Sequence, residues 1–516
     1  MRRGIRGAAL LLGASLVAGG GALAATTSDG SPSGTPSTSP APVDAGGVLH
    51  LLTESAFPSL DPARLTTPRD RNVGRLLYRA LMTYGSDGKS VVPDLAASPG
   101  VASMGGRRWT YALRTDAVYE DGTRVVPADV VRGFQRAVAL HAPTGGASVT
   151  ATPTSVVVTF GRPFADADEV ATLLAFAPVP AKGVLASGPY RVDSLKPGVS
   201  FRLVRNEAYV DDDVLRAQPD EIDGELGLEG ATIDRRLTEG SGPDAFAVTD
   251  KHSLEATTTV PKKHVARGLD ASILFTTMNT RTGPFSDVKV RQAFEVAYPL
   301  AAVRAAAGGA AVGDYASDVL PPFLDAHLRD DFYGQKKLKY AGDPLRAKQM
   351  LANAGYSDGV TVTTVVPLSS KPAADALVAG LATSGFTVKV TTVAAASYYA
   401  TIGAKAPDLA TYAWSPDWLT PSAYLPSLFT CAVLTATDNH NVSNHCDPSF
   451  DAQVSSALGD GTDRRWAALD RRLLEEAVVV PRFYGVATAL VGKRVSDARA
   501  ALAFGGAVDL GNVTLH

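Results

Sequence analysis

Hydrophobic and polar positions alternate along several short stretches of the chain in ways that predict individual strands and helices. Apolar or alternating runs at Val48–Leu52, Trp109–Leu113 and Ser155–Phe160 have the length and period of strands. Apolar residues recur at helical spacing in Ala128–Leu140 and Ala373–Ser384. The pattern therefore predicts a chain that mixes strands and helices, and we find no internal repeat in it.

The clearest local order lies in the later half of the chain. Asp343 can cap a helix, Pro344 suits its first turn, and Gly355 follows its last apolar residue. Strand-like segments follow at Val360–Val366 and Thr387–Val393, on either side of the next predicted helix. Strand, helix and strand joined by short links predict an α/β unit with parallel strand pairing.

The N-terminus has the composition of an export signal. A short positive segment with three arginines precedes the uncharged run Ala8–Ala22, and Ala22-Leu23-Ala24 supplies a small-x-small cleavage pattern. We therefore interpret residues 1–24 as a signal peptide, with an uncleaved N-terminal anchor as the alternative. Residues 25–47 are rich in Ser, Thr, Pro and Gly and are interpreted as a disordered linker.

Length and charge narrow the class of protein. A chain of 516 residues with 45% hydrophobic content has room for about three structural units. Removing residues 1–24 takes away three arginines and no acid, which shifts the formal net charge from −3 to −6. The predicted mature protein therefore lacks the basic field that a nucleic-acid partner needs.

Two cysteines, Cys431 and Cys446, stand close together near the end of the chain. An exported protein folds in oxidising surroundings, which favours a disulfide between them. Two alternatives remain open: a pair of buried free thiols, or a metal site that also uses His440 and His445.

We find no motif that indicates catalysis or a cofactor. The chain has no Gly-x-Ser-x-Gly elbow, no His-Glu-x-x-His pair and no Gly-x-x-x-x-Gly-Lys loop. The acidic run Asp211–Asp213 lacks the spacing of a calcium loop and is interpreted as a solvated turn. We therefore expect no enzyme activity, no cofactor and no bound metal.

Short segments spread over most of the chain resemble the extracellular solute-binding proteins of family 5, the peptide/nickel-type components of ATP-binding-cassette (ABC) importers. These segments stand in the family's order: Ser59–Pro62, Leu77–Leu81, Pro93–Ala96, Trp109–Arg114, Glu120–Thr123, Gly188–Tyr190, Arg205–Tyr209, Gly283–Asp287, Val290–Phe294 and Ala347–Leu351. The resemblance implies an α/β, two-lobed fold like that of periplasmic binding proteins, of type II and the large peptide-binding cluster, with an extra inserted subdomain. It also implies a disulfide at Cys431 and Cys446.

The same resemblance implies domain boundaries. The first lobe would combine residues 48–81, 182–266 and 481–516, with the inserted subdomain at 82–181 and the second lobe at 267–480. Lobes of this kind typically close over a ligand held between them.

The ligand site that the resemblance implies centres on Asp417, which with Trp414 matches the Trp-x-x-Asp pattern of the peptide-binding relatives. There the carboxylate meets the ligand's α-ammonium group, through a charge-assisted hydrogen bond. Trp414 and Trp418 can add aromatic walls. The alternative is that Asp417 caps a turn after Pro416 while both tryptophans pack in the core.

Two positions depart from the dipeptide-binding pattern. Lys371 stands where those relatives carry an arginine that clamps the peptide carboxylate, and the alternative is a solvated lysine before a helix. The segment Thr66-Thr67-Pro68 lies where the family lends backbone groups to an extended peptide, yet Pro68 has no N–H to donate. We therefore expect weaker peptide pairing along that segment.

The resemblance leads to one functional hypothesis with rivals. The chain is expected to bind a short peptide as a monomer outside the cytoplasm and to deliver it to an ABC permease with its ATPase subunits. It has no cysteine before Cys431, so a lipid anchor after the signal is not expected. Alternative ligands are a nickel chelate, an opine, haem or an oligosaccharide, and an alternative role is that of a peptide-sensing receptor.

Overall fold

A computed structural model describes residues 46–516 except 58, 211–213, 251–260 and 436–438. The predicted signal peptide, the linker up to residue 45 and the acidic run Asp211–Asp213 lie outside the described residues. Within the described part of the chain, no helix is both long enough and apolar enough to cross a membrane.

The first structural part, which we call lobe I, is built on a five-stranded sheet in the order β11-β1-β10-β9-β8. The predicted strand Val48–Leu52 is confirmed as β1, which pairs in parallel with β10 and β11. The other strands and the helices of this part are β8 Tyr190–Lys196, β9 Ser200–Arg205, β10 Glu221–Glu225, β11 Ala247–Thr249, α1 Pro68–Leu77 and α4 Gly230–Glu239.

An inserted part carries its own antiparallel sheet in the order β4-β5-β7-β6. The predicted strands at 109–113 and 155–160 are confirmed within one residue, and the helix predicted at 128–140 begins and ends one residue earlier. The elements are β2 Met82–Tyr84, β3 Val91–Pro93, β4 Val101–Ser103, β5 Arg108–Ala112, β6 Ala147–Ala151, β7 Ser155–Phe160, α2 Pro127–Ala139 and α3 Ala167–Val170.

The second structural part, which we call lobe II, is built on a six-stranded sheet in the order β13-β17-β12-β16-β14-β15. Its strands are β12 Val265–Met278, β13 Asp314–Tyr315, β14 Val360–Pro367, β15 Phe386–Val393, β16 Leu409–Trp414 and β17 Val479–Leu490. The predicted parallel pairing is confirmed, because β14 runs parallel to both β15 and β16.

The helices of lobe II are α5 Val288–Ala297, α6 Leu300–Ala306, α7 Pro344–Asn353, α8 Lys371–Gly380, α9 Tyr398–Lys405, α10 Leu425–Phe429, α11 Pro448–Asp460 and α12 Asp463–Glu475. The predicted cap of α7 is confirmed, since the Asp343 carboxylate accepts from the Arg346 N–H at 2.9 Å. The helix predicted at 373–384 begins two residues earlier and ends four residues earlier.

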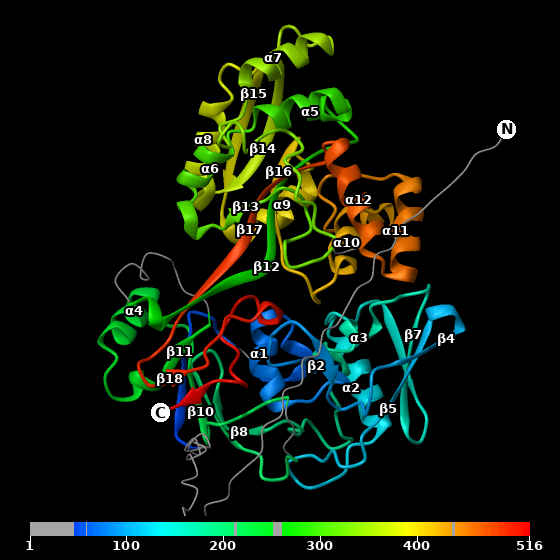
Figure 1. Cartoon of the computed structure of the whole chain (residues 1–516), viewed down its shortest axis with the longest axis vertical. Coiled ribbons are helices and arrows are strands. Elements are labelled where there is room, and N and C mark those ends of the chain that lie inside the picture. Colours follow the sequence, from blue (N-terminus) through cyan, green and yellow to red (C-terminus); the bar gives the residue numbers. More distant parts are fainter. Residues whose placement is uncertain (1–45, 58, 211–213, 251–260, 436–438) are drawn as a thin grey trace, which may run out of the picture. The chain divides into compact units, whose positions relative to one another are not determined.

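Strands β12 and β17 are the long antiparallel pair of the molecule, visible in Figure 1 as two extended ribbons side by side. All twelve residues of β17 are buried. Just beyond its end, Val491 forms a bridge with Val248 in β11, so the pair leads from the sheet of lobe II to that of lobe I. The hairpin of β18 Val495–Ser496 and β19 Thr514–Leu515 follows. As a proposal, we keep the domain boundaries that the family resemblance implies.

Cys431 and Cys446 form a disulfide, as predicted, across a separation of 15 residues. The bond joins the short turn after α10 to the residue before Asp447, whose carboxylate caps α11. It therefore fixes the start of α11 against the end of α10.

Removing this bond is expected to cost about 3 kcal/mol of unfolding free energy, the chain-entropy value for a loop of this length. The double variant Cys431→Ser, Cys446→Ser should show the loss in urea unfolding. A variant that unfolds at the wild-type urea concentration would contradict a stabilising role, and thiol labelling of the denatured wild type without reductant should find no free thiol.

Candidate functional site

Asp417 lies just past the end of β16, three residues after Trp414. Its side chain is 34% exposed, and the Arg71 guanidinium of α1 lies beside it, with Nη1 at 3.6 Å from Oδ1. This distance describes an ion pair rather than a hydrogen bond. A residue of lobe II therefore faces a residue of lobe I at this point.

The segment Thr66-Thr67-Pro68 positions Arg71. Thr67 caps α1 through a reciprocal pair of hydrogen bonds with Asp70, and Pro68 is the first helical residue, where the missing N–H costs nothing. The Thr66 carbonyl accepts from Arg71 Nη1 at 3.2 Å. The structure thus brings this predicted segment to Asp417 through Arg71, but as a helix start rather than as a free extended edge.

Burial and the nearby positive charge shift the pKa of the Asp417 carboxyl in opposite directions. Desolvation raises the pKa of its carboxyl, and the neighbouring Arg71 guanidinium partly offsets that rise. A desolvated carboxylate that has a cation nearby but lacks a close donor is suited to receive an ammonium group with short hydrogen bonds.

The two tryptophans take different places. Trp414 is half-buried, donates from Nε1 to the Ala423 carbonyl at 2.8 Å, and packs its ring against His440. Trp418 is only 8% exposed, donates to Ser422 Oγ and packs edge-on against Phe164 of the inserted part. The contacts of Trp418 are those of a core residue, so its predicted place in the ligand site stays a prediction.

Lys371 is the first residue of α8 and is half exposed. Its ammonium lies 2.6 Å from the Asp375 carboxylate, one turn along the same helix. This is the arrangement of a solvated surface pair. The predicted role of Lys371 toward a ligand carboxylate gains no support from this geometry.

Two acidic residues of the inserted part, which the sequence did not reveal, contact the segment that follows Asp417. Thr420 Oγ1 donates to Asp166 at 2.8 Å, and Tyr84 donates to Glu169 at 3.0 Å. Burial raises the pKa of Glu169 to about 7. These residues come from separate segments, so no local spacing in the sequence could have grouped them.

The raised pKa of Glu169 predicts a pH-dependent stability. The unfolded carboxyl ionises near 4.5 and the folded one near 7, so the folded state binds more protons between these values. Unfolding free energy should therefore fall as pH rises from about 4.5 to 7, by up to about 1.4 kcal/mol per pH unit from this group. Urea unfolding of wild type and Glu169→Gln across pH 5–8 isolates the effect, and a difference that is constant with pH would contradict it.

The two histidines near the disulfide have separate partners. His440 Nδ1 pairs with the Tyr412 hydroxyl at 2.7 Å, and His445 Nδ1 with the Phe429 carbonyl at 2.8 Å. Both cysteines are oxidised, which leaves no thiolate for the metal site considered as an alternative. In the part of the chain that the structure describes, no group of three metal-ligating side chains is found.

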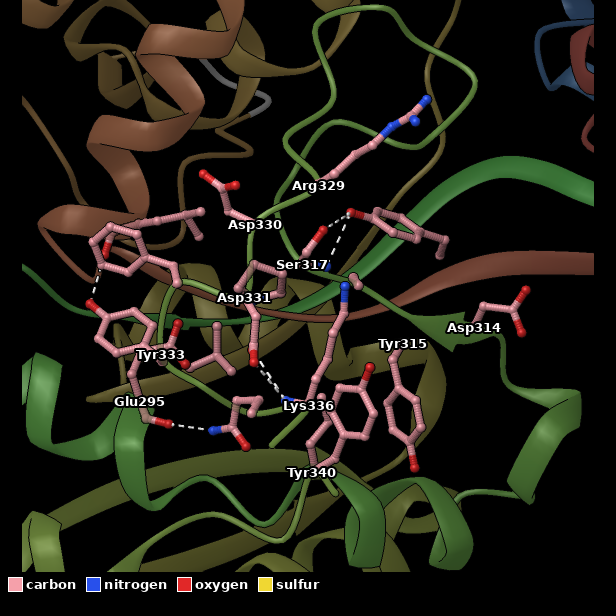
Figure 2. A pocket seen from close by; sticks show the side chains of 18 of the residues that line it. Glu295, Asp314, Tyr315, Ser317, Arg329, Asp330, Asp331, Tyr333, Lys336 and Tyr340 are labelled. Carbon is pink, nitrogen blue, oxygen red and sulfur yellow. Dashed lines mark hydrogen bonds between the residues drawn. The ribbon is translucent and has the colours of Figure 1, made fainter. Parts of the chain in front are cut away.

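A cavity of about 440 Å³ lies in lobe II between α5, α12, β13 and β17. Figure 2 shows the rings of Tyr315 and Tyr340 side by side at one side of it, with centroids 3.7 Å apart, and Tyr333 near Glu295 at the other. Glu295 is 3% exposed, and burial raises the pKa of its carboxyl well above the usual range. Two carboxylates of the lining form ion pairs, Asp314 with Arg304 and Asp330 with Arg471.

Comparison with known proteins identifies the family. The model described as bacterial extracellular solute-binding proteins, family 5 middle, matches residues 90–435, which is more than half of the chain. A solved structure of clavulanic acid biosynthesis oligopeptide binding protein 2 is similar, with a TM-score of 0.83 and 27% identity, over 92% of this chain and 96% of that one.

Curated relatives are more distant. Haem-binding protein A of Haemophilus influenzae is 26% identical over 53% of this chain and 49% of its own length. The glutathione-binding protein GsiB of Escherichia coli is 24% identical over 60% of this chain and 62% of its own length. The periplasmic oligopeptide-binding protein OppA of Escherichia coli is 23% identical over 85% of this chain and 87% of its own length. The chain belongs to the bacterial extracellular solute-binding proteins of family 5.

Proposed function

We propose that this protein binds a short peptide outside the cytoplasm and delivers it to an ABC permease, without catalysing a reaction. The observation that carries the proposal is the position of Asp417, a desolvated carboxylate at the end of β16 that faces α1 of lobe I. In this proposal, Asp417 receives the peptide's α-ammonium group, and Trp414 lies beside it.

The names of the relatives support a peptide as the ligand. OppA of Escherichia coli is an oligopeptide-binding protein, and a relative in Pseudomonas aeruginosa, 23% identical over 82% of this chain, is a di/tripeptide-binding protein. Export by the predicted signal peptide, a monomeric state and docking to a permease with separate ATPases complete the proposal.

Arg71 is part of the proposed mechanism. The partly exposed, desolvated carboxylate of Asp417 is stabilised by the Arg71 guanidinium, whose Nη1 lies 3.6 Å from Oδ1. An incoming ammonium can approach Asp417 more closely than this guanidinium does and can form hydrogen bonds that the ion pair lacks. Arg71 thus stabilises the Asp417 carboxylate and leaves its oxygens able to accept hydrogen bonds from an ammonium group.

The proposal is tested by comparing the tripeptide Ala-Ala-Leu with its N-acetylated form in calorimetric titrations of the wild-type protein. Acetylation removes the ammonium charge and keeps the rest of the peptide. We expect the free peptide to bind at least about tenfold more tightly, the effect of about 1.4 kcal/mol. Equal affinities would contradict the ammonium anchor.

One rival is a non-peptide solute on the same fold, since the relatives include a haem-binding protein. A second rival is a receptor that reports a peptide without importing it. The titration separates the first rival from the proposal, and uptake of labelled peptide by cells with and without the protein separates the second.

A further inference from the structure

A second cavity of about 280 Å³ lies inside lobe II, between one face of the six-stranded sheet and the helices α6 and α8. Its walls are mostly apolar or small, and several are alanines. The lining residues are Leu274, Thr276, Tyr298, Val303, Ala306, Ala307, Val312, Thr364, Val366, Ser369, Ser370, Ala373, Ala374, Leu377, Leu409, Thr411 and Arg482. Asp417 and Trp414 are absent from this described lining, and so are α1 and the five-stranded sheet of lobe I, so the cavity is separate from the site around Asp417.

Arg482 of β17 is the charged residue of this lining. Its side chain is only 6% exposed, and its Nε is buried without a hydrogen-bond partner. Nη1 makes one long contact, 3.4 Å to Thr411 Oγ1. Among the residues that the structure describes, no carboxylate lies within ion-pair distance of Arg482. The guanidinium lies over the Phe483 ring, 5.2 Å from its centroid, but it lacks both a counter-ion and full hydrogen bonding.

A buried arginine, unlike a buried carboxyl group, cannot lose its charge. The buried Glu295 of the larger cavity can avoid the cost of a desolvated charge by holding its proton. A guanidinium stays protonated in proteins, so Arg482 cannot do the same. Burying a charge without a partner costs several kcal/mol, and the cavity beside Arg482 gives room for an anion that would remove this cost.

The lining next to the start of α8 also favours an anion. Ser369 is exposed and Ser370 half-buried, and both precede the ten-residue helix α8. The Ser370 side chain makes no capping hydrogen bond to the helix. The positive end of the α8 dipole therefore lies at this edge of the cavity, next to a hydroxyl that is not used as a cap.

We propose that this cavity binds a carboxylate carried on an apolar body, with the carboxylate on Arg482 and the apolar part against the alanines of α6 and α8. A single guanidinium matches a singly charged carboxylate, which it can hold through two parallel hydrogen bonds. A phosphate would bring a second charge into a lining that has one cation. The carboxylate can be the C-terminus of a short peptide with an apolar last residue, or a free amphipathic acid.

The inference goes beyond the proposed function, because it does not depend on Asp417. It also places the recognition of a carboxylate at Arg482 rather than at Lys371, whose charge Asp375 already balances. No signal in the sequence marks Arg482, which stands in a run of apolar residues in β17.

The test is calorimetric titration of the full-length protein with four probes: octanoate, octanamide, Ala-Ala-Leu and the C-terminal amide of that peptide. Each pair differs in the carboxylate alone. At least one carboxylate should bind wild type about 30-fold or more tightly than its amide, the loss expected when one partner of a buried charge pair is removed. Preference for octanoate or for the peptide identifies the source of the carboxylate.

Three variants complete the design. Arg482→Gln should lose the preference for the carboxylate, whereas Arg464→Gln, at an exposed arginine of α12 outside the cavity, should keep it. Ala374→Phe fills the cavity and keeps the charge, so it should lose binding as well. Circular dichroism reports whether each variant folds. If Arg482→Gln does not fold, the binding measured with Ala374→Phe tests the proposed cavity.

Two results would overturn the inference: equal binding of carboxylates and amides by wild type, including no binding of either, or unchanged binding by folded Arg482→Gln or Ala374→Phe. Failure of the proposed function would give a different result. Free and N-acetylated peptides would then bind with equal affinity, while carboxylates would still bind more tightly than their amides.

Discussion

Asp417→Ala is expected to weaken the binding of Ala-Ala-Leu by about 2–5 kcal/mol, which is roughly 30-fold to several thousandfold in Kd. The reason is that the ligand ammonium would remain desolvated beside Trp414 without its counter-charge. Asp417→Asn keeps the shape and loses the charge, so it should bind almost as weakly as the alanine variant. Calorimetric titration of the three proteins under one buffer condition measures the effect.

The unfolding free energy of the Asp417 variants is the control for this prediction. Asp417 is 34% exposed, its ion pair with Arg71 is long at 3.6 Å, and Arg71 keeps its hydrogen bond to the Thr66 carbonyl, so loss of the carboxylate should lower the unfolding free energy by no more than about 1 kcal/mol. If Asp417 instead caps a turn, the outcome is reversed. The melting temperature would then fall clearly while the affinity for the peptide would stay near that of wild type.

Asp470→Ala is expected to lower the unfolding free energy by about 2–6 kcal/mol. Asp470 of α12 is 0% exposed, and its two oxygens accept from the backbone N–H groups of Val319 and Leu320 at 3.1 and 2.9 Å. Without the carboxyl, both N–H groups are buried with no acceptor, at about 1–3 kcal/mol each. Urea unfolding monitored by tryptophan fluorescence measures the loss.

Asp470→Asn is the matched control. Burial and the nearby Asp318 raise the pKa of the Asp470 carboxyl well above its usual range. An amide has the same shape but only one acceptor oxygen, and its NH2 group cannot accept from the second backbone N–H. The asparagine variant should therefore keep one of the two contacts and lose about 1–3 kcal/mol, roughly half the loss of the alanine variant. Equal losses in the alanine and asparagine variants would contradict a stabilising role for the contact that asparagine keeps.

Local sequence signals predicted the local structure of this chain well. The cap at Asp343 and the proline after it fixed the start of α7, and the apolar runs at 360–366 and 387–393 became β14 and β15. These signals act within one turn or one strand, so they can be interpreted without knowledge of distant segments. The helix at 371–380 was predicted two residues late, because Pro372 stands inside its first turn rather than before it.

The candidate site was only partly predictable, because its charges meet across long distances in the chain. The Trp-x-x-Asp pattern drew attention to Asp417, but its ion-pair partner Arg71 is far away in the sequence and has no distinctive spacing. The buried acid Glu169 and the unpaired Arg482 were missed for the same reason. Burial and the absence of a counter-ion are properties of the folded chain, whereas the sequence shows only the residue type.

The late position of β17 has a consequence for how the protein is made. Strand β17 lies between β12 and β13, and residues further along, including Val508, Leu510 and Leu515, pack with Leu49 of β1 in the core of lobe I. Strand β1, which is made early, therefore lacks part of its packing partners until almost the last residues have been made. Neither lobe therefore has its complete core until the last part of the chain has been made.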